Sequence, residues 1–131
     1  MKLFVPGAPA PQGSKRHVGR GILIESSKAV GPWRERVALA AHSNADGLMT
    51  GPVSVGLDFV MPRPKSAPKR STPPAVKRPD IDKLARAILD ALTGICWNDD
   101  SQVVALTATK RLAEIGETAG VHITLDTKDH E

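Results

Sequence analysis

Alternating apolar and polar residues predict a strand in the middle of the chain. Val53, Val55, Leu57, Phe59 and Met61 alternate with Ser, Gly, Asp and Val directly after a Gly-Pro turn. A repeat of two residues is typical of a strand with one buried face. The same reasoning predicts strands at 2–5, 102–110 and 120–126, and a candidate strand at 21–25.

Two helices are predicted from apolar residues at helical spacing. Pro32 suits a first helical turn, and apolar residues recur from Trp33 to Ala41 until 44–47 ends the pattern. A stronger stripe follows in 80–93, where the apolar residues are three or four positions apart. They are Ile81, Leu84, Ala85, Ile88, Leu89 and Leu92, and Gly94 ends this second helix.

The order of these elements predicts an α+β fold, in the broad α/β class, with two helices packed on a mixed sheet. At 131 residues the chain has the length of a single domain, taken here as 1–131. If the function requires two identical active sites, a chain this short must self-associate, so a homodimer is expected in that case.

Segment 62–79 is predicted to be a long, mobile, basic loop. It holds six of the eleven prolines, which exclude a helix or a central strand. A solvated surface is one interpretation of its basic run, and polyanion binding is the other, because neutralised phosphates release counterions. The run contains no acidic residue and comprises Arg63, Lys65, Lys69, Arg70, Lys77 and Arg78.

Cysteine usage and hydropathy exclude several classes of protein. Cys96 is the only cysteine, so an internal disulfide and a zinc site of thiolates are both excluded. Cys96 is interpreted as a packed core residue, and Trp97 as an anchor that positions the turn at Asp99 and Asp100. No signal peptide or membrane-spanning stretch is indicated, and we expect a soluble, cytoplasmic protein that does not contact a membrane.

Acidic residues gather at the two ends of the second predicted helix. Asp80 and Asp82 lie at its start, and the pair Asp99 and Asp100 follows its end. Helix capping is the ordinary interpretation of the first pair. If the loop 94–98 folds back, a carboxylate of the second pair would join the first in an oxygen-only site. Such a site suits Mg²⁺, or Mn²⁺ in its place.

The basic loop joins this acidic cluster directly at Pro79. Phosphate-binding and metal-binding surfaces would then be adjacent, as nuclease chemistry requires. Arg86 lies one helical turn after Asp82, where it can meet a carboxylate or a phosphate oxygen. An i,i+4 ion pair along the helix is the competing interpretation.

Three runs of the sequence match the motifs of one known family. They are RPDIDKLARAILDAL from Arg78 to Leu92, WNDDSQVV from Trp97 to Val104, and PAPQGSKR from Pro9 to Arg16. The chain closely resembles RusA-type Holliday junction resolvases of bacteria and phages, and the resemblance covers nearly its whole length.

This resemblance implies a RusA-like, homodimeric, Mg²⁺-dependent endodeoxyribonuclease in the cytoplasm of a bacterial cell or phage-infected host. It would resolve four-way junctions by paired symmetric nicks in DNA recombination and repair. By position, Asp80, Asp82 and Asp100 are implied to be the catalytic, metal-binding carboxylates. Arg86, the fourth candidate catalytic residue, stands where family members often have a functionally important Lys.

The predicted partner is therefore branched DNA. The residues expected to hold its backbone are Lys15, Arg16, Lys65, Lys69, Arg70, Lys77 and Arg78. Two alternatives stay open at this point. One is a non-catalytic nucleic-acid-binding accessory protein of the same fold, and the other is a nuclease that prefers flaps or RNA.

Overall fold

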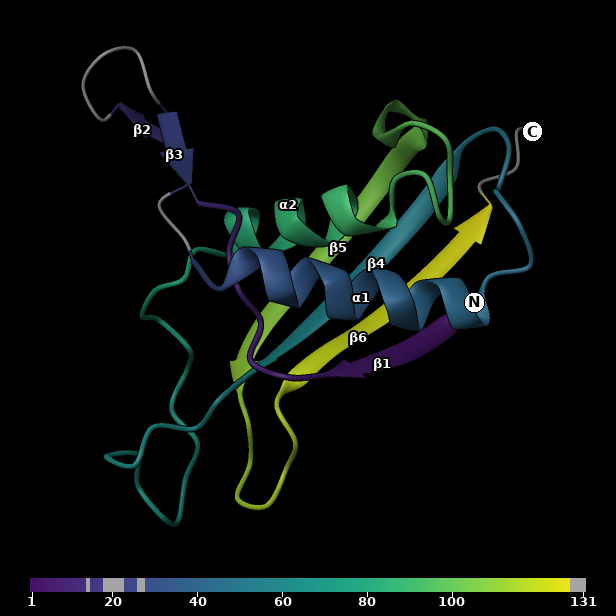
Figure 1. Ribbon diagram of the computed structural model, residues 1–131. Coiled ribbons are helices and arrows are strands. Elements are labelled where there is room, and N and C mark those ends of the chain that lie inside the picture. Colours follow the sequence, from purple (N-terminus) through teal and green to yellow (C-terminus); the bar gives the residue numbers. More distant parts are fainter. Residues whose placement is uncertain (14, 18–22, 26–27, 128–131) are drawn as a thin grey trace.

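The structure is a computed structural model that describes residues 1–13, 15–17, 23–25 and 28–127. It contains six strands, two α-helices and one short 3₁₀ helix, η1, in these ranges (Figure 1). In chain order they are β1 (Lys2–Pro6), β2 (Lys15–His17), β3 (Leu23–Glu25), α1 (Val30–Asn44), β4 (Val53–Met61), α2 (Ile81–Leu92), η1 (Asp100–Gln102), β5 (Val103–Leu112) and β6 (Gly120–Thr127).

The four longer strands form one mixed sheet in the order β1-β6-β4-β5. Strands β4 and β5 run parallel, whereas β6 is antiparallel to both β4 and β1. Both helices cover the same face of this sheet (Figure 1). The predicted single α+β domain, with two helices on a mixed sheet, is confirmed.

The parallel pair determines where the candidate site lies. Two parallel strands need a long crossover connection, and here the connection between β4 and β5 contains the basic loop and α2. Residues 62–79 form neither helix nor strand, as the prolines predicted. The mobility of this loop stays a prediction.

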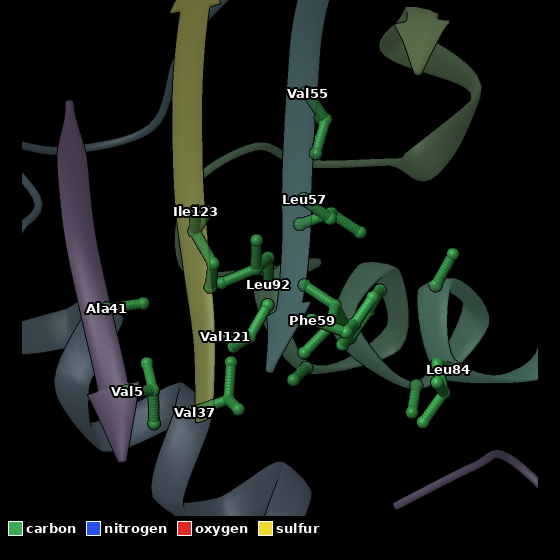
Figure 2. Close-up of a cluster of buried hydrophobic side chains, with 14 of the residues drawn as sticks. Val5, Val37, Ala41, Val55, Leu57, Phe59, Leu84, Leu92, Val121 and Ile123 are labelled. Carbon is green, nitrogen blue, oxygen red and sulfur yellow. The ribbon is translucent and has the colours of Figure 1, made fainter. Parts of the chain in front are cut away.

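The core lies between the sheet and the helices (Figure 2). Leu57, Phe59, Leu84 and Leu92 are at most 1% exposed, in accord with the strand and helix periods. Ile81 departs from the prediction, because it is 37% exposed. It is the first residue of α2, and the buried contacts of the helix begin at Leu84.

Two short strands form a separate ribbon outside the main sheet. Strand β2 pairs antiparallel with β3, with Lys15 opposite Glu25. The candidate strand at 21–25 is confirmed for 23–25, and its first two residues lie outside the described range. The sequence did not predict β2.

The segment after α2 is anchored by Trp97, as predicted. Its side chain is fully buried, and its indole Nε1 donates a hydrogen bond of 3.0 Å to Thr93 Oγ1. Cys96 beside it is 1% exposed, and this burial raises the pKa of its thiol. The prediction that Cys96 is a packed core residue is therefore confirmed.

Candidate active site

Two exposed carboxylates stand at the N-terminus of α2. Asp80 occupies the N-cap position, but its side chain makes no capping hydrogen bond. Its main-chain carbonyl accepts from Leu84 N at 3.1 Å, and Asp82 follows in the first turn. Within the described part of the chain, neither carboxylate has a hydrogen bond or an ion pair. The capping interpretation therefore does not account for the side chain of Asp80.

In the second acidic pair, Asp99 takes part in a helix cap and Asp100 is its exposed neighbour. Asp99 Oδ1 accepts from Ser101 N at 2.9 Å, and the side chain of Gln102 completes a capping box around η1. The Ser101 hydrogen bonds, above all the one from its main chain, lower the pKa of Asp99. Asp100 is the exposed neighbour that begins η1.

Asp100 lies far from Asp80 and Asp82 within one chain. Lys110, near the end of β5, donates to Pro79 O at 2.8 Å, which places Asp80 at that end of the strand. Asp100 belongs to η1, directly before β5, and β5 begins near the C-terminal end of α2 (Figure 1). The twelve residues of α2 alone span about 18 Å.

The expected return of loop 94–98 to the first acidic pair therefore does not occur within a single chain. Gln102 Nε2 instead donates to Met49 O and Gly51 O, which holds the segment around Asp100 at the start of β4. Across the described residues, no three Asp, Glu, His or Cys side chains form a group able to hold a metal ion.

Arg86 lies on the exposed surface of α2 and pairs with Asp90. Its Nε is 3.6 Å from Asp90 Oδ1, and its side chain is 66% exposed. Arg34 of α1 approaches the other oxygen of Asp90 at 3.8 Å. Both separations are long for ion pairs between exposed groups, which contribute little to stability. The structure thus gives Arg86 the helix ion pair that was the competing interpretation of its sequence position.

The N-terminal segment also reaches α2. Gln12 N donates to Lys83 O at 3.0 Å, and Gln12 Oε1 accepts from Arg34 Nη1 at 3.0 Å. This places the PAPQ portion of the N-terminal motif beside the acidic end of the helix. Lys15 and Arg16 follow on β2, and their side chains lie outside the description.

The basic loop is folded around Arg63. Arg63 Nη1 donates to Thr72 Oγ1 at 2.8 Å and to Ala113 O at 3.1 Å, while Nη2 donates to Ser71 O at 2.6 Å and to Pro68 O. Arg63 is thus a structural residue. The other basic side chains of the loop are exposed: Lys65, Lys69, Arg70, Lys77 and Arg78.

Lys110 is a site residue that the sequence analysis missed. Its Nζ donates to Lys77 O at 2.9 Å as well as to Pro79 O, so it holds the last residues of the loop beside Asp80. Lys110 is paired in register with buried Phe59 and faces the helices. The signal that could have identified Lys110 is its position as a charged residue on the buried face of a predicted strand.

Comparison with known proteins connects this arrangement to one family. The family model described as Endodeoxyribonuclease RusA matches residues 6–126. The chain belongs to the RusA family. A Bacillus subtilis (strain 168) protein named "Uncharacterized protein YqaN" is 32% identical in an alignment 127 residues long, and the match covers 87% of this chain and 89% of that protein.

Membership of the RusA family implies endonuclease activity on Holliday junctions, within DNA recombination. It confirms the resemblance stated from the motifs, over nearly the whole length of the chain. Among the described residues, no helix is long and apolar enough to cross a membrane.

Proposed function

We propose that this RusA-family protein is a Mg²⁺-dependent endodeoxyribonuclease that resolves four-way junctions by paired, symmetric nicks. The observation that carries this proposal is the placement of Asp80 and Asp82. They are two exposed carboxylates that have no partner among the residues described by the structure, at the point where a loop rich in lysine and arginine enters a helix.

The donor set fits a hard divalent cation. Asp80 and Asp82 offer only carboxylate oxygens, which Mg²⁺ and Mn²⁺ prefer, and two such anions close together favour a bound cation. When bound, Mg²⁺ supplies charge stabilisation at the scissile phosphate and lowers the pKa of water. The two aspartates would hold the ion beside the DNA backbone.

The basic residues would supply the positive charge that holds the DNA backbone. Lys65, Lys69, Arg70, Lys77 and Arg78 are exposed on the loop that ends at Asp80, where they would hold the phosphates of the cleaved strand. Arg86 has a long, exposed ion pair with Asp90, which it can exchange for a phosphate oxygen at low cost. Branch shape would be recognised by charge and geometry more than by base edges.

We further propose that Asp100 completes the metal site of a second copy of the chain. Asp100 is separated from Asp80 and Asp82 within one chain, yet it is exposed and its neighbour Asp99 is engaged in a cap. A symmetric dimer brings such complementary halves together twice. This accounts for a homodimer and for two active sites that nick symmetrically.

The test is cleavage of a labelled four-way junction with and without Mg²⁺, comparing wild type with Asp82→Asn. Linear duplex, a flap and an RNA hairpin serve as competing substrates. Asp46→Asn is the matched control, since Asp46 is exposed and lies in the segment after α1. We expect Mg²⁺-dependent paired nicks on the junction with wild type and Asp46→Asn. Asp82→Asn should lose at least about 100-fold in rate.

Binding without cleavage by the wild type would instead identify a non-catalytic accessory protein of the RusA fold. Preferential cleavage of the flap or the RNA hairpin would retain the metal chemistry and overturn junction resolution.

A further inference from the structure

An apolar cavity of about 570 Å³ lies beside the proposed metal site. Its walls come from the basic loop, the N-terminal segment around Pro9, and Met61 and Leu112 at the ends of β4 and β5. Prolines dominate the lining: Pro9, Pro62, Pro64, Pro68, Pro73, Pro74 and Pro79. The volume is in the range of small-ligand sites, roughly 300–1,000 Å³.

Hydrogen bonds within the chain hold the walls of the cavity together. Arg63 ties Pro68, Ser71 and Thr72 to Ala113 through four hydrogen bonds, and Lys110 holds the carbonyls of Lys77 and Pro79. Proline has a fixed φ and loses little conformational entropy when it is ordered. A preformed site avoids the cost of ordering its walls when it binds.

The charges around the cavity indicate what it receives. Lys77 and Arg78 line it and are exposed, and Lys65, Lys69 and Arg70 lie on the same loop. An apolar interior with a cationic border suits a ligand that has a flat, uncharged ring and a phosphate next to it. A nucleotide unit of DNA has this chemistry.

We propose that this cavity takes up an unstacked nucleobase next to the scissile phosphate. The proposal rests on the proposed function, since the base belongs to the DNA that is cut. Pro79 lines the cavity and directly precedes Asp80, so a base held there would place its own phosphate near the two aspartates. Proline rings offer apolar surface on which a base can pack, whereas other base-binding sites use aromatic side chains for this.

A branched substrate makes this arrangement favourable. Withdrawing a base costs its stacking and pairing energy, and the cost is lowest where the helix is already interrupted. The branch point of a four-way junction is such a place. The cavity would therefore favour junctions over linear duplex without any contact to a base edge.

The test uses junctions in which 2-aminopurine replaces one base at a time around the branch point. Binding is measured without divalent metal, by anisotropy for affinity and by 2-aminopurine emission for unstacking. Ala75→Leu and Ala67→Leu fill the cavity from two positions of its lining. Ser71→Leu is the matched control, since Ser71 is exposed on the same loop and is not part of the lining.

We expect emission to rise severalfold at one position with wild type and Ser71→Leu, and to stay flat with both cavity-filling variants. The cavity-filling variants should also lose most of the preference for cutting junctions over linear duplex. Far-ultraviolet circular dichroism and sedimentation check that each variant has the wild-type fold and oligomeric state.

Two results would contradict the uptake of a base by the cavity but would not contradict the proposed function. In the first, the wild type binds and cuts the junction, but 2-aminopurine emission rises at no position, or it still rises with the cavity-filling variants. In the second, filling the cavity changes the oligomeric state, which would show that a second copy covers it. Failure of the wild type to bind or cut any junction would instead overturn the proposed function itself, and this inference with it.

Discussion

At the residue scale, Lys110 connects the sheet to the candidate active site. The residue is half-buried, and its ammonium group donates to two main-chain carbonyls, those of Lys77 and Pro79. Hydrogen bonds from a charged donor contribute more than neutral ones, about 1.5–3 kcal/mol each. The position of Asp80 relative to β5 therefore depends on this side chain.

We expect Lys110→Met to lower the free energy of unfolding by about 1–3 kcal/mol. It should also raise the Mg²⁺ concentration needed for half-maximal junction cleavage severalfold, because Asp80 loses its fixed position. Urea unfolding and a Mg²⁺ titration of the cleavage rate measure the two effects. Lys28→Met, at an exposed position that precedes α1, is the control. An unchanged Mg²⁺ titration would contradict a positioning role.

Sequence alone could not distinguish the roles of the adjacent residues Asp99 and Asp100. Asp99 and Asp100 have the same chemistry and neighbouring positions, so spacing does not distinguish a cap from a metal ligand. The choice of Asp100 came from the family resemblance. The structure shows that the carboxylate of Asp99 accepts from Ser101 in a capping box, and the metal-binding role of Asp100 stays a prediction.

At the element scale, two glycines differ in the space that the structure leaves for a Cβ atom. A Cβ at Gly120 would collide with the carbonyl oxygen of Val5 and the ring of Phe4 across the β1–β6 pair. A Cβ at Gly31, in the first turn of α1, would meet no atom within 4 Å. The same substitution should therefore have opposite signs at the two positions.

We expect Gly120→Ala to destabilise the protein by about 1–3 kcal/mol through overpacking. Gly31→Ala should stabilise it by about 0.5–1 kcal/mol, because alanine has the higher helix propensity. Equilibrium unfolding in urea measures both values. A stabilising effect of Gly120→Ala would show that β1 is not held against β6 as described.

The elements that the sequence predicted well are those in which apolar residues recur at a regular spacing without interruption. Strand β4 and helix α2 each bury a regular stripe, and both were found within a residue or two of their predicted bounds. Strand β2 was missed because its three residues, Lys15 to His17, have no apolar alternation. The separation of Asp100 from Asp80 could not be predicted, because it depends on how α2 lies along β5.

At the scale of the whole molecule, the proposed dimer predicts that two inactive variants can restore each other. Asp82→Asn and Asp100→Asn should each be inactive alone. Mixed after unfolding and refolding together, they form heterodimers in which one site combines Asp82 of one chain with Asp100 of the other. We expect these heterodimers to nick a junction on one strand only.

Denaturing gels of a junction labelled on each strand in turn measure this outcome. The mixture of wild type with Asp82→Asn is the reference for single nicks. If the mixture of the two variants stays inactive while that reference nicks, the two carboxylates act within the same chain, and the trans site is wrong.

Because its only cysteine is buried, the native chain should react little with thiol reagents. Thiol reagents attack the thiolate, and Cys96 is both enclosed in the core and shifted towards its protonated form. A cysteine introduced at an exposed position such as Lys69 or Asp46 would therefore carry the only fluorophore. Changes in distance between the basic loop and a labelled arm of DNA can then be followed on single molecules, with the native sequence otherwise unchanged.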